Sequence, residues 1–117
     1  MFEGRRLVVI STTDYTHYGP GYGQTRAENL SENEAYARSH DQPILQSILS
    51  NQPEQLIQTQ RTTQNSMCGL WSSIIVMILS KMLNDGRGQW QLLCYNISSE
   101  VMKRGKDVCG FASLVYS

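Results

Sequence analysis

The sequence predicts a mainly α-helical protein, a compact bundle of about five helices around a central hydrophobic helix, with room for a short N-terminal β-strand. Three observations lead to this prediction. Residues 65–83 are apolar on nearly every face of a helix, apolar residues at positions 44, 45, 48 and 49 recur at helical spacing, and several polar segments have the pattern of helix starts. The 117 residues are of the size of one domain, so residues 1–117 are expected to form one core.

The first elements are expected in the N-terminal third of the chain. Residues Leu7–Ile10 are apolar or β-branched and favour a short strand. The glycine and proline density of residues 12–24 predicts an irregular loop. Thr25–Glu28 and Ser31–Glu34 both fit a capping box, in which a hydroxyl and a carboxylate satisfy the first backbone amides of a helix. Either start predicts a helix that ends near Ser39.

Three further helices are expected in the middle of the chain. Asp41 and Pro43 indicate a new helix start, because proline is tolerated in a first helical turn. Asn51–Glu54 starts a short helix that runs to about Arg61. Asn65 or Ser66 then caps the long hydrophobic helix, which ends near the glycines at 86 and 88.

The C-terminal third is harder to assign. Trp90, Leu93, Cys94, Ile97 and Val101 lie at helical spacing, although residues 92–95 also suit a buried strand. Helix is favoured because a polar stretch and Lys103–Gly105 follow the apolar residues like a helix end. Residues 107–117 leave the same two alternatives open.

Composition excludes several classes of function. Ten basic residues balance ten acidic ones and no basic run occurs, so no nucleic-acid partner is expected. The apolar run is about half the length of a membrane span, so no membrane association is expected. Three cysteines at scattered positions favour free thiols in a soluble intracellular protein. Neither C-x-x-C nor H-x-x-x-H spacing occurs, so no metal and no cofactor are predicted.

Cys68 supports one functional hypothesis. It lies at the expected first turn of the hydrophobic helix, where backbone amides and the helix dipole favour a thiolate. The stretch Gln64–Trp71 resembles the Gln…Cys-Gly neighbourhood of papain-like and ubiquitin-like-protease cysteine peptidases. That resemblance implies a cysteine-dependent hydrolase or acyltransferase with Cys68 as nucleophile, His17 or His40 as base and Gln64 at the oxyanion. Both histidines precede the cysteine, which departs from the papain-like order. A buried structural thiol is the other interpretation.

Protein binding is the preferred hypothesis. The loop with Tyr15, His17, Tyr18 and Tyr22 combines tyrosine and glycine as paratopes do, and it is the predicted surface for another protein, such as an enzyme that the chain inhibits. An all-round apolar helix needs cover on nearly all sides, which predicts a homodimer. The residues expected in this core or dimer helix are Leu70, Trp71, Ile74, Ile75, Ile78 and Met82.

The short, Asn/Gln/Ser-rich composition resembles small bacterial effectors that inhibit ubiquitin-directed deamidase and transglutaminase effectors. This resemblance implies a non-enzymatic regulator or inhibitor that acts by steric occlusion, and delivery into a host cell cytoplasm. The sequence is therefore interpreted as a helical homodimer that blocks a partner, with the thiol enzyme as the alternative.

Overall fold

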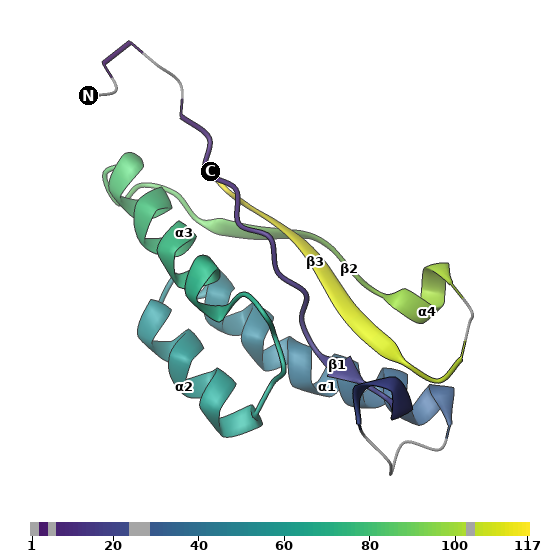
Figure 1. Cartoon of the computed structure of the whole chain (residues 1–117). Coiled ribbons are helices and arrows are strands. Elements are labelled where there is room, and N and C mark those ends of the chain that lie inside the picture. The colour runs from purple at the N-terminus through teal and green to yellow at the C-terminus, as the bar shows by residue number, and fades with distance from the viewer. Residues whose placement is uncertain (1–2, 5–6, 24–28, 103–104) are drawn as a thin grey trace.

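The computed structural model describes residues 3–4, 7–23, 29–102 and 105–117. Within these ranges, helices pack on a three-stranded antiparallel sheet with strand order β1-β3-β2 (Figure 1). The strands are β1 (His17–Tyr18), β2 (Trp90–Ile97) and β3 (Val108–Tyr116). The helices are α1 (Leu30–Leu49), α2 (Pro53–Thr63), α3 (Leu70–Leu83) and the short α4 (Ser98–Val101), with a 3-10 turn at Pro20–Tyr22.

The predicted mainly α-helical bundle was wrong, because the C-terminal third forms a sheet. Residues 90–97 are strand β2 and residues 108–116 are its partner β3. A bulge between Leu92 and Cys94 explains why β2 has helical spacing in the sequence. The register passes from Leu92↔Leu114 to Cys94↔Ser113, which leaves Leu93 as an extra residue. Such an insertion interrupts the alternation of a strand, so apolar residues recur at intervals of three and four.

The N-terminal elements also differ from the prediction. Residues 7–12 are extended but belong to no strand, and the capping box at Thr25–Glu28 lies outside the described residues. Helix α1 begins after Asn29, whose side-chain oxygen accepts from the Glu32 amide at 2.8 Å. It continues through Pro43 instead of restarting there. An internal proline costs a helix about 3 kcal/mol, and burial of Ile44 and Ile48 in the core offsets this cost.

The two helices that follow confirm the helices predicted from Asn51–Glu54 to about Arg61 and from Asn65 or Ser66 to near Gly86, with shifted ends. Pro53 occupies the first turn of α2, and Gln64 ends the helix in the left-handed conformation. Helix α3 begins after Gly69 rather than at Asn65 or Ser66. Among the described residues, none of the helices combines the length and the apolar character needed to cross a bilayer.

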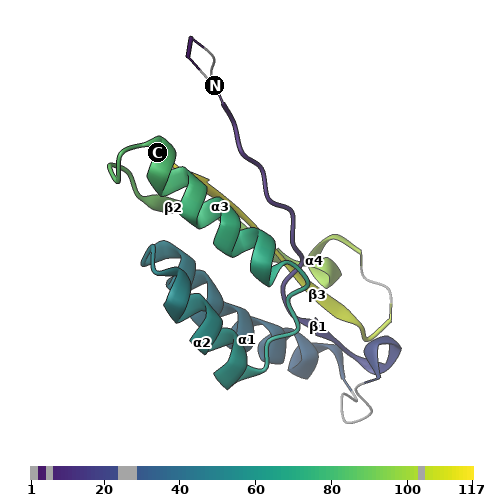
Figure 2. The ribbon, with the colours of Figure 1, turned by 60° about the vertical axis from the view of Figure 1, so that its left-hand side comes forward.

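The core lies between α1 and the sheet. Ile44, Leu45 and Ile48 of α1 meet Leu56 of α2 and Met77 of α3 in the main cluster of buried side chains. Ile97 and Val108 form a second cluster with Ala37 near the α4 end of the sheet. Helix α2 packs on α1, and α3 packs on α2 (Figure 2).

Candidate functional site

The pairing of β1 with β3 brings three metal-ligating side chains together. His17 lies opposite Cys109 in the antiparallel register, which puts both side chains on the same face of the sheet. Asp14 lies three residues before His17, and its carboxylate lies close to the His17 and Cys109 side chains. One ligand atom from each of Asp14, His17 and Cys109 lies within 4.8 Å of the other two. We call this group the Asp-His-Cys cluster.

Backbone contacts fix the orientation of the His17 ring. Its Nδ1 lies 3.2 Å from the Ser66 carbonyl oxygen, and an oxygen that only accepts requires Nδ1 to carry the hydrogen. The other nitrogen, Nε2, then presents a lone pair toward Asp14, whose Oδ2 lies 3.7 Å away. The Ser66 hydroxyl also accepts from the His17 amide at 2.7 Å. A metal-binding histidine typically donates the N–H of its other ring nitrogen to a carbonyl oxygen of this kind.

Cys68 lies beside the cluster and is held by the same chain segment. Its sulfur accepts from the Asp14 amide at 3.3 Å, and its own amide donates to the Asp14 carbonyl at 3.1 Å. Thr13 completes the connection by accepting from the Gly69 amide at 2.7 Å. Among the described residues, no hydrogen bond joins Cys68 to His17 or Gln64. The catalytic roles predicted for these three residues stay a prediction.

The two thiols near the site differ in exposure. Cys68 is exposed, whereas Cys109 is 6% exposed. Burial raises the pKa of the Cys109 thiol to about 12, and the charges of Asp14, Asp41 and Cys68 raise it further in the same direction. Cys109 is therefore a neutral thiol at physiological pH unless a cation stabilises its thiolate.

This difference predicts selective alkylation. With metal removed, iodoacetamide at pH 7.5 should modify the exposed Cys68 and Cys94 much faster than Cys109, because only thiolates react. The Cys109 rate should rise about tenfold per pH unit, since its pKa lies far above the pH range of the assay. Peptide mass spectrometry after timed quenching measures each rate. Equal rates for Cys109 and Cys94 would contradict the buried, neutral state of Cys109.

A buried carboxylate connects the segments that carry the site. Asp41 of α1 is fully buried and accepts four hydrogen bonds. The donors are the Thr16 amide at 2.9 Å, the Thr16 hydroxyl at 2.6 Å, the Asn65 amide group at 2.9 Å and the Tyr95 hydroxyl at 2.7 Å. Asn65 in turn accepts from the Met67 amide, next to Cys68.

Asp41 therefore fixes the strand of His17, the segment of Cys68 and the neighbourhood of Cys109. Gly110 lets β3 pass directly over the carboxylate, because a β-carbon there would overlap Asp41 and lie 3.1 Å from the Tyr95 hydroxyl. Burial and the hydrogen bond to Asp41 raise the pKa of Tyr95, so its hydroxyl remains a donor at physiological pH.

The tyrosines predicted to bind a protein lie in different environments. Tyr15 is 2% exposed and belongs to the core, and Tyr18 stacks on Tyr36 with ring centroids 3.7 Å apart. Tyr22 is 47% exposed, and its ring makes a T-shaped contact with the His17 ring. The protein-binding role of this loop is not tested by these positions and stays a prediction.

The residues predicted for a core or dimer helix divide between two sides of α3. Ile74 is buried and Leu70 packs against the core. Trp71, Ile75, Ile78 and Met82 are exposed. The homodimer itself stays a prediction.

The sequence interpretation missed Asp14, Asp41 and Cys109 as parts of a site. Asp14-x-x-His17 is a visible pattern, but two ligands in a loop do not identify a metal site without a third. The third, Cys109, is distant in the sequence and arrives only through the β1–β3 register. The arrangement therefore offers a site that ligand spacing alone did not indicate.

Comparison with known proteins places these observations in a family. The family model described as Memo-like protein matches residues 1–115. A MEMO1 family protein of Pyrococcus furiosus is 30% identical over 116 residues, which cover 96% of this chain and 38% of the relative. A MEMO1 family protein of Thermococcus kodakarensis is 30% identical over 117 residues, covering 97% and 38%. One from Methanococcus maripaludis is 30% identical over 112 residues, covering 95% and 34%. The chain thus spans little more than a third of the length of these relatives.

These matches overturn the predicted resemblance to bacterial effectors. That resemblance depended on a short length and an Asn/Gln/Ser-rich composition, whereas the similarity to MEMO1 family proteins extends over nearly every residue of the chain. The predicted steric inhibitor or regulator of a ubiquitin pathway was therefore wrong, and nothing supports the predicted host delivery.

Proposed function

Because the chain belongs to the Memo-like protein family, we propose that it contributes a transition-metal site to an enzyme-type activity, with Asp14, His17 and Cys109 as ligands. The observation that supports this proposal is the convergence of three different ligand atoms within 4.8 Å. Cys68 is the adjacent thiol, held at the backbone of Asp14, and its sulfur is near enough for its charge to affect Cys109.

The chemistry of the ligands favours particular ions. One carboxylate, one imidazole and one thiolate suit divalent first-row metals such as Fe²⁺, Co²⁺ or Zn²⁺, whereas Ca²⁺ and Mg²⁺ prefer oxygen alone. Three protein ligands leave at least one position for a substrate or water, as in catalytic zinc sites. When bound, such an ion supplies Lewis-acid chemistry at a coordinated oxygen.

Residues around the three ligands hold them in position for metal binding. Ser66 fixes the His17 ring so that Nε2 is free to bind, and Asp41 holds the segments of all three ligands in register. The Asp14 side chain is 49% exposed and that of His17 is 23% exposed, so the open side of the site is reached from solvent. The expected substrate class is a small oxygen-donor ligand that can coordinate the ion.

Metal titration tests the proposal. Adding Co²⁺ to the metal-free chain under reducing, anaerobic conditions should produce a thiolate-to-metal absorption band with one ion bound per chain. His17→Ala and Asp14→Ala should each weaken binding by more than the roughly 10–100-fold that loss of an outer-shell partner costs, and Cys109→Ser should also remove the absorption band. Cys109 is a neutral thiol in the metal-free chain and must lose its proton to bind the ion. Calorimetry in buffers of different ionisation enthalpy should therefore show release of a proton when Co²⁺ binds.

Cys94→Ser is the matched control, since Cys94 is an exposed thiol on β2 outside the cluster. Its variant should bind Co²⁺ like the unmodified chain. If the absorption band persists in Cys109→Ser and disappears in Cys68→Ser, then Cys68 is the thiolate ligand. This result would contradict the assignment of Cys109. Stoichiometric binding that survives the loss of His17 and Asp14 would overturn the site as a whole.

A further inference from the structure

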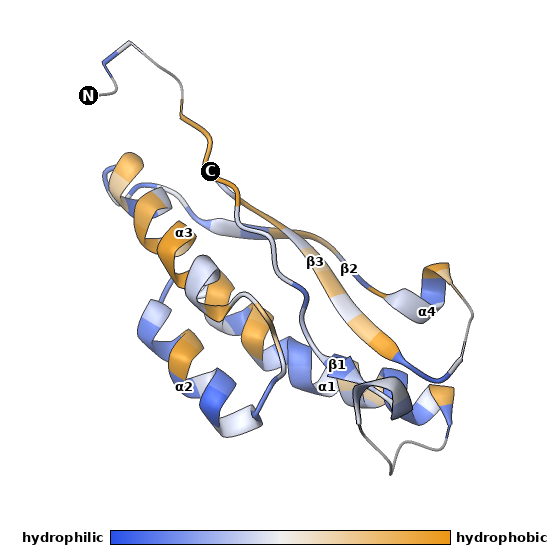
Figure 3. Ribbon diagram, viewed as in Figure 1, coloured by the Kyte–Doolittle hydropathy of each residue, from blue (hydrophilic) through white to orange (hydrophobic). Residues whose placement is uncertain are grey.

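The outward side of α3 carries a row of exposed apolar side chains. Their exposed fractions range from 36% for Leu79 to 68% for Met82. Figure 3 shows hydrophobic colour over most of the helix. We call this row the α3 stripe, and its members are Trp71, Ile75, Ile78, Leu79 and Met82. A contiguous exposed apolar row marks an interaction surface, whereas ordinary surfaces carry such residues singly.

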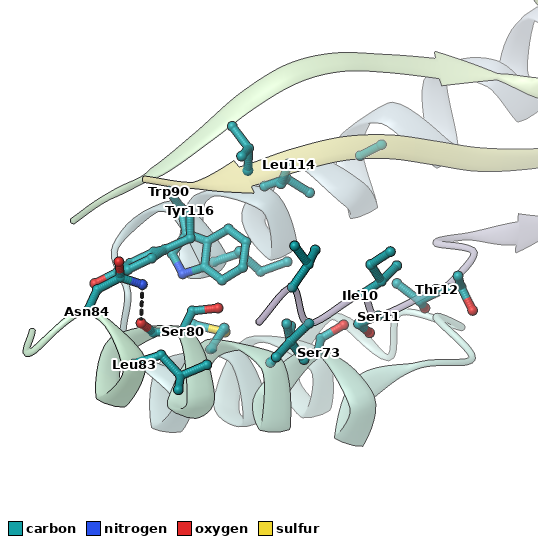
Figure 4. A pocket seen from close by; sticks show the side chains of 18 of the residues that line it. Ile10, Ser11, Thr12, Ser73, Ser80, Leu83, Asn84, Trp90, Leu114 and Tyr116 are labelled. Carbon is teal, nitrogen blue, oxygen red and sulfur yellow. Dashed lines mark hydrogen bonds between the residues drawn. The ribbon is translucent and has the colours of Figure 1, made fainter. Parts of the chain in front are cut away.

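The α3 stripe is separate from the other two sides of the helix. Ile74 and Met77 belong to the main core cluster. Ser73, Ser80 and Leu83 line the cavity between α3 and the sheet (Figure 4). Successive residues of a helix are rotated by about 100°, which places the stripe on the side of α3 opposite the cavity. Whatever fills the cavity therefore leaves the α3 stripe exposed.

The spacing of the stripe is that of a seam between paired helices. Trp71, Ile75, Ile78 and Met82 are separated by four, three and four residues. The a and d positions of a coiled coil alternate in this way, and each inserts between side chains of a second helix with the same alternation. The α3 helix of another copy has this pattern by identity, and a two-fold axis makes such a contact self-complementary.

An antiparallel pair suits the side chains of the stripe. With the two-fold axis between positions 75 and 78, Trp71 lies opposite Met82 of the second copy, and Ile75 lies opposite Ile78. A methionine sulfur makes a favourable contact with an aromatic ring. The N-terminus of each helix then lies beside the C-terminus of the other, so that the two helix dipoles attract.

Charge does not oppose this contact. Lys81 is the only charged residue of Leu70–Leu83. In the antiparallel pair it lies opposite Ser72 of the second copy, so like charges do not meet across the seam. The formal net charge of the chain is zero, and a protein without net charge does not repel its own copies.

The area of the stripe is sufficient for a weak dimer. A whole side chain of this size offers roughly 150–250 Å², so the exposed fractions leave on the order of 500 Å² of apolar surface on each chain. Two stripes together provide about 1,000 Å², which is the lower end for a specific interface. Burial at this lower end predicts a dissociation constant in the micromolar range.

We propose that the chain forms a homodimer through the α3 stripe, with the two α3 helices antiparallel. The stripe matches a second copy of itself in spacing, in charge and in area. The dimer uses none of the ligands of the Asp-His-Cys cluster, so it is independent of metal binding.

Self-association of the chain tests the dimer. Sedimentation velocity and light scattering should show a monomer at nanomolar concentration and a dimer at high micromolar concentration. Ile78→Glu should raise the dissociation constant at least about tenfold, because each copy then buries a charge in an apolar interface. Trp71→Ala removes the largest side chain of the stripe without adding a charge, and it should also raise the dissociation constant at least about tenfold.

Two complementary variants test the antiparallel orientation. Ile75→Glu and Ile78→Lys should each dimerise poorly alone. Mixed together, they should form a heterodimer at least about tenfold tighter than either homodimer, because position 75 of one chain faces position 78 of the other and the opposite charges pair. In a parallel pair each position faces its own equivalent, so mixing brings no opposite charges together. A dimer that gains nothing on mixing would contradict the antiparallel arrangement.

Val101→Glu is the matched control, because Val101 on α4 is 80% exposed and lies outside the stripe. It should dimerise like the unmodified chain. Far-ultraviolet circular dichroism should show the same helix content in Ile78→Glu as in the unmodified chain, since Ile78 is exposed in the monomer. A chain that stays monomeric at high micromolar concentration, or a dimer that Ile78→Glu leaves intact, would overturn the proposal.

Two other occupants of the stripe give different results. In a Trp90→Phe background, Trp71 is the only tryptophan. If vesicles of an anionic phospholipid shift its emission to the blue while the chain stays monomeric, the stripe binds a lipid surface. If the unmatched part of the Pyrococcus furiosus relative dissociates the dimer, that polypeptide covers the stripe. Either result would count against the homodimer.

Discussion

Asp41→Ala should destabilise the fold more than any other single polar substitution, by about 3–5 kcal/mol. Removal of the carboxylate leaves donors from Thr16, Asn65 and Tyr95 unpaired in a fully buried place. Each buried unpaired donor costs about 1–3 kcal/mol, and natural domains are stable by only about 5–15 kcal/mol. Urea unfolding followed by circular dichroism measures the change in the free energy of unfolding.

Two further variants separate the hydrogen bonds from the shape of the side chain. Asp41→Asn keeps the size of the side chain but places an amide donor among the donors from Thr16, Asn65 and Tyr95. The free energy of unfolding of this variant should therefore lie between those of the unmodified chain and Asp41→Ala. Asp85→Asn is the matched control: Asp85 is exposed and its backbone is in the left-handed conformation, which asparagine also accepts. Its effect should stay within about 0.5 kcal/mol. A loss below 1 kcal/mol for Asp41→Ala would show that the network does not stabilise the fold.

Gly110→Ala should have the second-largest effect, a loss of about 1–3 kcal/mol or more. The added methyl would overlap the Asp41 carboxylate, which four hydrogen bonds hold in place, and would crowd the Tyr95 hydroxyl. Relief requires β3 to move away from α1, and Cys109 moves with it. Metal affinity should therefore fall together with stability, and Co²⁺ titration next to urea unfolding measures both.

Ser113→Ala on the same strand is the control for Gly110→Ala. Ser113 is exposed, and its replacement by alanine adds no atoms near Asp41. It should leave both stability and Co²⁺ affinity unchanged. Normal stability in Gly110→Ala would mean that β3 tolerates a side chain at this position, and the close approach of strand and carboxylate would then be unimportant.

The helices were predictable where local chemistry determines them. Pro53 and the polar residues before it indicate the start of α2, and the apolar run near Ile74 indicates α3. The sheet was not predictable in the same way, because the bulge at Leu93 gives β2 the spacing of a helix. The continuous α1 was missed because Pro43 suggests a break, and tertiary packing of Ile44 overrides that preference.

The candidate site was predictable only in part. His17 and Cys68 attract attention by residue type, but their partners depend on folding. Asp41 looks like a helix cap next to Pro43 in the sequence, whereas in the structure it is the buried centre of a network. Cys109 looks like one apolar strand residue among others until the register places it opposite His17. No local pattern contains either fact.

The Asp41 network also has a consequence for the order of folding. Its hydrogen bonds join residues 25, 49 and 54 positions apart, and the contact between Gly21 and Asp107 spans 86. Loop closure over such separations costs entropy before any contact compensates for it. The helices therefore form early and the ligand cluster forms late. A chain that is still emerging during synthesis lacks Cys109 and Gly110 until β3 has been made, so the cluster cannot be complete before then.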